Sequence, residues 1–316
     1  MFFIKKATIL HEKEIVSNLR QVITDITPEV AESTKVNYIT AVNKLAKFLK
    51  EALPGKKLTA YNIKPGQVKA MERWLLDSGL SPNYTALLMR CLRALINRIN
   101  QRGYELFKDV RTSRCETVKR AVSEETMKQL RAMELDDAPK LNQARNIFLF
   151  CFFCMGMPLI DAVYLKKSQL KNDIITYYRR KTHRMVNVVV TDELRAIIKT
   201  LGTDVSSPYL LPILTGGGNF WECTKEYRRF YQRYMRALGR ISQKLGLKCN
   251  LTSYTARHTW ASIAYKNNGD INSISQSLGH SNSFSWPRMG PFLLPAWAGR
   301  SQTWQRKQFR KRPPTR

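Results

Sequence analysis

Apolar residues recur at helical spacing in the first third of the chain. One stripe lies within 34–51 and another within 81–102. The first consists of Ile39, Val42, Leu45 and Leu49, and the second of Leu88, Leu92, Leu95 and Ile99. Residues three or four apart share one face of a helix, so both segments are predicted to be amphipathic helices that bury these stripes. Ser81 is a suitable N-cap for the second helix, with Pro82 as its first helical residue.

Basic side chains occupy positions between these apolar stripes. Lys44 and Lys47 lie on the first predicted helix, and Arg90 and Arg93 lie on the second. A further helical segment is expected around 66–78. A basic face on one helix is usually just solvated, but several such faces in one domain favour a surface that binds phosphate groups. These four residues are therefore candidate DNA-binding residues.

The pattern predicts two domains. A small all-helical domain is expected over 28–104, preceded by an N-terminal segment over 1–27. Residues 105–122 lack a clear period and are predicted to form a linker. A second domain is expected over 123–282. The remainder, 283–316, is basic and rich in Pro and Trp, with no visible period.

The second domain is predicted to be mainly α-helical with a small β-sheet. Ser123 opens a helix, and the strongly apolar run within 143–157 indicates a buried one. Two β-branched segments within 173–190, joined by the turn KTHR, predict a hairpin. Further helices are expected over 191–201, 224–245 and 256–267.

The net charge narrows the class of partner. The chain has 53 Lys and Arg against 24 Asp and Glu, a formal net charge of +29. Such an excess repels itself in a compact fold and is typical of proteins that bind a polyanion. Nucleic acid is the favoured partner. An acidic membrane surface would call for one strongly amphipathic basic helix, and an RNA-binding protein would be expected to show an aromatic RNA-stacking motif.

Other function classes find little support in the sequence. No apolar run is long enough to span a membrane, and the start of the chain does not resemble a signal peptide. The pair Cys151 and Cys154 lies inside the apolar run, which favours core packing over a metal or redox site. We expect no metal, no cofactor and a reducing cytoplasm. The run GGG at 216–218 lacks the residues of a phosphate-binding loop and is interpreted as an ordinary loop.

The informative string is TSYTARHTWASIAYKNNGDINSISQSLGHSN at 252–282. It places Arg257 and His258 on one helix and His280 after the next. ARHTxA followed at this interval by LGHS resembles the tyrosine recombinase (phage integrase) family, particularly integrases of mobile elements in Bacteroides-like bacteria. The resemblance covers about 28–282.

The resemblance implies a fold and an activity. The first domain is similar to the family's helical core-binding (SAM-like) domain and the second to its catalytic domain. The family exchanges strands of double-stranded DNA through a covalent 3′-phosphotyrosine, as a homotetramer and without a metal. Arginines are suited to the phosphate oxygens of the transition state, and a lysine on the hairpin protonates the departing oxygen.

Individual residues are carried over by their match to the family's motifs. Lys181 matches the hairpin lysine, with Arg180 beside it as a DNA-binding residue. Arg257 matches the second catalytic arginine, His258 the adjacent histidine, and His280 the later histidine that donates to the scissile phosphate. Tyr254 stands where the family usually has a histidine. A tyrosine hydroxyl can donate to phosphate, but it is a poorer proton carrier near neutral pH.

Two departures put activity in doubt. The family's first arginine is absent, because Pro158 occupies its place between Gly156 and Asp161, and Met155 occupies the alternative place. Arg145 is a candidate substitute. Where the family carries its nucleophilic tyrosine this chain has Met289, and the last tyrosine in the sequence is Tyr265.

The segment 283–316 has three interpretations. It contains no tyrosine and no acidic residue, and three prolines would break the helix expected there: Pro287, Pro291 and Pro295. We hypothesise that it is out-of-frame sequence. It could instead be a genuine basic tail, or the nucleophile could come from another subunit or another residue type. The sequence thus supports either a recombinase or a DNA-binding relic of one.

Overall fold

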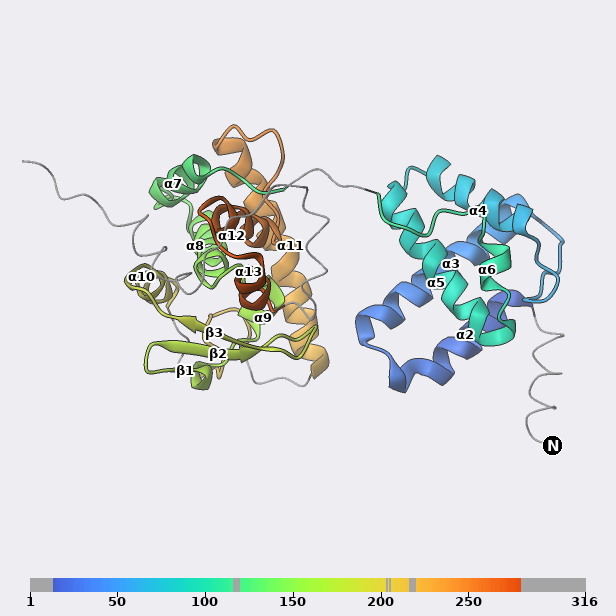
Figure 1. The fold of residues 1–316 in the computed structure, drawn as a ribbon, viewed down its shortest axis with the longest axis horizontal. Helices are drawn as coiled ribbons and strands as arrows, with labels where there is room; N and C mark the ends of the chain where they lie inside the picture. Colours follow the sequence, from blue (N-terminus) through green and yellow to red (C-terminus); the bar gives the residue numbers. More distant parts are fainter. Residues whose placement is uncertain (1–13, 116–119, 203, 205, 216–219, 280–316) are drawn as a thin grey trace, which may run out of the picture. The chain divides into compact units, whose positions relative to one another are not determined.

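The computed structural model describes residues 14–115, 120–202, 204, 206–215 and 220–279. The chain divides into two compact units, Met1–Thr117 and Val118–Arg316. The prediction of a mainly α-helical chain with one small antiparallel sheet is confirmed (Figure 1). No described helix is long and apolar enough to cross a membrane.

The first unit consists of helices around one apolar core. In chain order its elements are α2 (Ile15–Ile26), the 3₁₀ turn η1 (Thr27–Glu29), α3 (Glu32–Ala52), α4 (Pro65–Asp77), α5 (Pro82–Asn100) and α6 (Gly103–Leu106). The predicted start of α5 is confirmed, since the Ser81 side chain accepts a hydrogen bond from the Tyr84 amide and Pro82 begins the helix. The left-handed Gln101 follows its last residue.

The predicted apolar stripes form most of this core. Val42, Leu45, Leu88, Leu92 and Leu95 are buried, while Leu49 and Ile99 pack partly buried against them. The prediction was wrong for Ile39, which is 41% exposed. Ile39 lines an open groove of about 490 Å³ between α2, η1 and the first turns of α3, which no other described helix lines.

The unit extends beyond the predicted 28–104 at its start. The segment 1–27 was not assigned to it, yet α2 buries Ile15, Leu19 and Ile26 in the same core. The Ile15 amide donates to the Leu58 carbonyl at 2.7 Å, which ties the first turn of α2 to the chain between α3 and α4. The apolar residues of this segment recur at helical spacing, which is the signal that its sequence offered.

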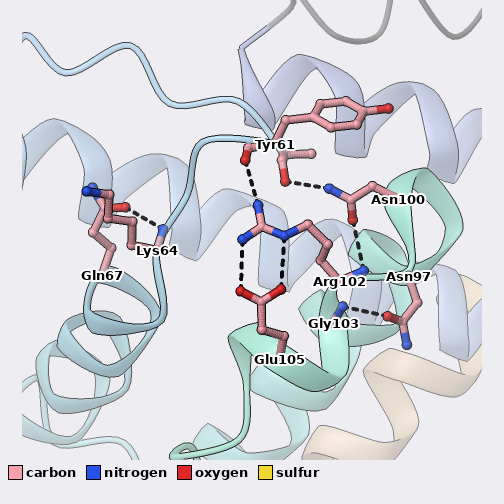
Figure 2. A network of polar contacts seen from close by, with 9 residues as sticks. Tyr61, Lys64, Gln67, Asn97, Asn100, Arg102, Gly103 and Glu105 are labelled. Atoms are coloured by element: carbon pink, nitrogen blue, oxygen red, sulfur yellow. Dashed lines mark hydrogen bonds and ion pairs between the residues drawn. The ribbon is translucent and has the colours of Figure 1, made fainter.

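The unit also extends into the predicted linker 105–122. Figure 2 shows Arg102 holding the Glu105 carboxylate in a two-pronged pair while also donating to the Tyr61 carbonyl at 2.5 Å. Asn97 accepts from the Gly103 amide in the same network, where a Cβ on Gly103 would meet the Asn97 side chain. These contacts fold the chain back, so that three apolar residues of the predicted linker are buried: Leu106, Phe107 and Val110.

The second unit contains helices and a three-stranded sheet. Its helices are α7 (Glu124–Ala132), α8 (Pro139–Phe153), α9 (Leu159–Val163), α10 (Asp192–Leu201), α11 (Phe220–Lys244), α12 (Thr255–Lys266) and α13 (Ile271–Ser277), with the 3₁₀ turn η2 (Lys167–Gln169). Its strands are β1 (Leu170–Lys171), β2 (Ile174–Tyr178) and β3 (Met185–Val189). The Ser123 side chain caps α7, which begins where predicted, and the Thr191 side chain caps α10.

Helix α8 is the centre of this unit. Figure 1 shows it among α7, α10, α11 and α12, and it contacts each of them. A helix covered on several sides needs apolar residues all round, which explains the unbroken run that contains Phe148, Phe150 and Phe152. Cys151 and Cys154 are buried in this core, as expected, and burial raises the pKa of Cys151 to about 12. A thiol with that pKa stays protonated at neutral pH.

The predicted hairpin is present and forms most of the sheet. Strands β2 and β3 pair antiparallel, with Tyr178 opposite Met185 next to the connecting turn and β1 on the outer edge of β2. Alternate residues such as Ile175 and Val188 face the core. This register places the turn after Tyr178 at the end of the sheet nearest α9 and α13.

Candidate functional site

Arg257 is the best-defined member of the candidate site. It lies in the first turn of α12, is 4% exposed, and donates to two backbone carbonyls from other parts of the unit. Its Nη1 atom lies 2.9 Å from the Gly156 carbonyl oxygen, and its Nη2 atom lies 2.5 Å from that of Leu278. One guanidinium group therefore joins the loop after α8 to the end of α13.

Gly156 is required by this arrangement. Its φ is +69°, in the left-handed region that favours glycine, and a Cβ there would lie 2.9 Å from the Arg257 Cα. That distance is shorter than side chains tolerate, so the glycine allows the loop to approach α12. The sequence motif that contains Gly156 thus has a physical basis in the placement of Arg257.

The environment of Arg257 is strongly electropositive. Burial, together with the charge of Arg179, lowers its pKa to about 10. Arg257 remains charged at neutral pH, with little solvent to screen it. Such a group is stabilised by a bound anion.

Lys181 lies at the exposed tip of the hairpin. The turn is closed by hydrogen bonds of 2.8 Å from the Arg179 amide to the Arg184 carbonyl and from the His183 amide to the Arg179 carbonyl. The Thr182 hydroxyl donates to the Gly279 carbonyl at 2.9 Å. The turn that carries Lys181 is therefore attached to the residue that precedes His280.

Arg180 and Asp161 fix the other side of the hairpin turn. The Arg180 amide donates to Asp161 Oδ1 at 3.1 Å, and the Arg180 guanidinium lies 4.2 Å from the centre of the Tyr164 ring. Asp161 belongs to the short helix α9 and is buried. The hairpin thus docks on α9 through one carboxylate and one aromatic ring.

Tyr254 and His258 lie next to Arg257. Tyr254 immediately precedes α12, is 45% exposed, and contacts His258 edge to face with ring centres 5.1 Å apart. Burial lowers the pKa of His258, and the charges of Arg257 and Arg120 act in the same direction. His258 is therefore neutral near pH 7. In this neutral form one ring nitrogen can accept a hydrogen bond.

The shifted pKa of His258 predicts a pH dependence of stability. Its ordinary value is 6.5 and the folded value is lower, so the unfolded chain binds the proton more readily. The free energy of unfolding is then expected to be fully retained above pH 6.5 and to fall as the pH drops through the folded pKa. Urea unfolding of the wild type and His258→Gln at several pH values measures this effect, and equal pH dependence in both proteins would contradict it.

Some predicted site residues lie outside the described residues. His280 follows Gly279, whose φ is +62° and where a Cβ would lie 2.8 Å from Arg179 Cγ. Gly279 therefore lies close against Arg179. Met289 and the segment 283–316 also lie outside the described residues.

The candidate substitute for the first arginine does not join Arg257. Arg145 donates instead to the Met133 carbonyl, to Asn142 Oδ1 at 2.6 Å and to Asn146 Oδ1 at 3.1 Å. Its guanidinium is held by α8 and the residue after α7. Pro158 caps the start of α9, and Met155 is buried in the core.

The basic residues of the first unit lie on two helices that contact each other. Lys44 and Lys47 are on α3, and Arg90 and Arg93 are on α5. Lys47 is exposed and pairs with Glu51 at 3.6 Å, while the other three are half-buried. An exposed pair of this kind is weak and gives way readily to a phosphate. Their contact with DNA stays a prediction.

One residue of the site was missed from the sequence. Arg179 is 5% exposed and lies between Asp161 and Leu278. The signal was the alternation of the strand, because Ile175 and Tyr177 face the core and residue 179 continues that series. A buried arginine requires a partner, which here is Asp161.

The arrangement can bind an oxyanion and transfer a proton to it. Buried guanidinium groups from α12 and the hairpin meet at the Leu278 carbonyl, and the turn that carries the exposed Lys181 is hydrogen-bonded to Gly279. No cluster of side chains suited to a metal ion occurs among the described residues.

Solved structures share this fold. A lambda integrase dimer bound to a COC′ core site matches with a TM-score of 0.65 at 13% identity, over 95% of this chain and 84% of that one. A lambda integrase tetramer bound to a Holliday junction gives 0.63 at 13%, over 91% and 82%. The Tn1549 transposon integrase in complex with transposon right end DNA gives 0.61 at 13%, over 85% and 93%. No curated protein matches.

The match to a family model assigns the chain to a family, whereas the solved structures show only that the fold is shared. The model of the phage integrase family matches residues 118–285, which is more than half of the chain. This range contains the hairpin, α9, α12 and α13, and so every residue that surrounds Arg257. The chain therefore belongs to the phage integrase family.

Proposed function

We propose that this protein is a site-specific DNA recombinase that exchanges strands through a covalent 3′-phosphotyrosine. The observation that carries the proposal is the position of Arg257, fixed between the Gly156 and Leu278 carbonyls beside the hairpin turn of Lys181. We expect a phosphodiester bound here to be contacted by the Arg257 guanidinium group and by the Lys181 ammonium group of the adjacent turn.

Each residue has a role in the proposed reaction. A tyrosine hydroxyl gives up its proton to solvent as its oxygen attacks the phosphorus, the bond from phosphorus to the 5′ oxygen breaks, and the Lys181 ammonium gives a proton to the departing 5′ oxygen. Arg257 and His280 stabilise the charge on the phosphate oxygens. Tyr254 donates from its exposed position, and His258 packs against it and supports α12.

The partners follow from the same chemistry. We propose that the ligand is double-stranded DNA carrying a recombination site, bound in the cytoplasm near the nucleoid by a homotetramer. Support comes from solved integrases of this fold, described as a dimer on a core site and a tetramer on a Holliday junction. In the first unit, Lys44, Lys47, Arg90 and Arg93 would contact the DNA backbone, with Arg180 in the second. A role in a mobile element belongs to the same proposal.

A specific observation favours a second candidate function. The sequence has no tyrosine after Tyr265, and Met289 stands at the nucleophile's place. A chain that binds recombination sites without cleaving them would have this composition. The alternative is a DNA-binding relic of the family.

A nicked suicide substrate separates the two functions. Duplexes that bind the protein are first selected from a random library, and the protected site is then synthesised with a nick beside the cleavage position. The recombinase is expected to form a covalent protein–DNA product that survives denaturation. The relic binds the same duplex and forms none.

Two controls make the result specific. Arg257→Gln should abolish a covalent product, and mass spectrometry of the digested product identifies which residue carries the DNA. Translating the other two reading frames of the gene beyond codon 282 tests the out-of-frame hypothesis. If neither frame restores a helix with a tyrosine near position 289, that hypothesis fails.

A further inference from the structure

Arg179 occupies an unusual position for a strand residue. It follows β2 directly and points into the unit, where its Nε atom lies 2.8 Å from Asp161 Oδ2. Its Nη1 atom donates to the Leu278 carbonyl. Arg179 therefore joins the hairpin to α9 and to the end of α13, with 6% of its side chain exposed.

Arg179 and Arg257 converge on one oxygen atom. Arg257 Nη2 also donates to the Leu278 carbonyl, at 2.5 Å, so two guanidinium groups from different elements meet there. They are buried to the same degree, at 5% and 4% exposed. The two guanidinium groups are thus exposed to the same small extent, and an anion that reaches one of them lies near the other.

Positive charge exceeds negative charge around these two groups in the described part of the chain. Two buried guanidinium groups share Asp161 as their acidic neighbour, and Arg180 and Lys181 add two positive charges at the adjacent turn. The charge of Arg179 lowers the pKa of Arg257, which reflects their mutual repulsion. Buried charge in excess is unfavourable unless it is paired, so the pair is suited to receive one more negative charge.

We propose that Arg179 provides a second guanidinium group to the phosphate-binding site of Arg257. The inference rests on the proposed function and adds a DNA-phosphate ligand that the hairpin supplies. Arg179 then contacts a phosphate oxygen while Asp161 holds its Nε side in place. The hairpin contributes both a cation that binds the phosphate and, two residues later, Lys181.

A purely structural role for Arg179 makes a different prediction. In that case the Arg179–Asp161 pair only fastens the hairpin, and removing both partners alters stability without altering DNA binding. The double variant Asp161→Asn/Arg179→Gln distinguishes the two roles, since it removes one charge of each sign and leaves the net charge unchanged. Asn and Gln can still hydrogen-bond to each other.

The experiment is a salt titration of DNA affinity with full-length protein. A mixed-sequence duplex is the probe, and thermal unfolding first confirms that each variant is folded. The slope of log K against log salt is expected to fall by about 0.9 in the double variant, the value for one lost phosphate contact. Asp173→Asn/Arg195→Gln is the matched control, because that pair has the same 2.8 Å separation on the surface.

The outcomes separate this inference from the proposed function. An unchanged slope in the folded double variant overturns the role of Arg179 while leaving DNA binding intact. A wild type whose affinity shows no salt dependence refutes the proposed function itself. If the double variant does not fold, Arg179→Lys keeps the ion pair but loses the forked donor, and we expect affinity about tenfold weaker. Wild-type affinity in Arg179→Lys then counts against the proposal.

Discussion

Replacement of Asp161 by alanine is expected to lower the free energy of unfolding of the second unit by about 3–5 kcal/mol. The carboxylate is 2% exposed and pairs with Arg179 Nε at 2.8 Å. It also accepts from the Arg180 amide. Its loss leaves buried Arg179 and Arg257 without their acidic neighbour, and an uncompensated buried charge is far more costly than a lost surface contact.

Asp173→Ala is the matched control for this prediction. Asp173 pairs with Arg195 at the same 2.8 Å, but both side chains are more than half exposed. Its loss should cost far less than the loss of Asp161, because solvent screens the exposed pair. Urea unfolding followed by circular dichroism, fitted with one transition for each unit, measures both variants.

A second variant tests the physical reason. If the cost arises from unpaired charge, Asp161→Ala combined with Arg179→Met should recover part of the stability lost in Asp161→Ala alone. A double variant less stable than the single one would show that packing, and not charge, dominates at this position. Equal losses for Asp161→Ala and Asp173→Ala would contradict the argument from burial.

Local rules were enough to predict several helix starts and the hairpin. Ser81 before Pro82, Ser123 and Thr191 are N-cap residues whose effect depends only on the next three residues, and each caps its helix in the structure. The hairpin was likewise predicted from local sequence, by the two β-branched segments on either side of the turn KTHR. These signals do not depend on what packs against the element.

The prediction and the structure differ where contacts between residues far apart in the sequence determine which side chains are buried. Ile39 has helical spacing, but it lies in an open groove that the described elements leave uncovered. Leu106 and Phe107 have no clear period, yet the pairing of Arg102 with Glu105 folds them into the first core. A sequence pattern reports which face is apolar, and the tertiary fold determines whether that face is covered.

The same distinction applies to the candidate site. Arg257, His258 and the hairpin that carries Lys181 were found because they belong to contiguous motifs. Arg179 belongs to no such motif, and its importance depends on Asp161 and Leu278, which lie 18 and 99 residues away in the sequence. Its sequence signal was a charged residue at a position that the strand alternation assigns to the core.

DNA binding should depend steeply on salt. Between about 50 mM and 200 mM salt we expect the affinity for a mixed-sequence duplex to fall by about 10³–10⁵-fold, as for a protein that makes roughly six to ten phosphate contacts. The described residues supply that many cations. Helix α11 alone carries seven exposed ones: Lys225, Arg228, Arg229, Arg233, Arg236, Arg240 and Lys244. The four candidate residues of α3 and α5 add to them.

Paired variants locate the contacts that produce this dependence. Lys44→Gln/Lys47→Gln removes two predicted phosphate contacts from α3, so the slope should decrease by about 1.8. Lys128→Gln on α7 is the control, because this lysine is equally exposed and pairs with Glu125 at 3.9 Å. An affinity that hardly changes over this salt range would contradict DNA binding, since counterions released from phosphates are its main source of free energy. If the slope is steep and neither variant alters it, DNA is still the partner, but other cations contact its phosphates. The exposed basic residues of α11 are then the next to replace.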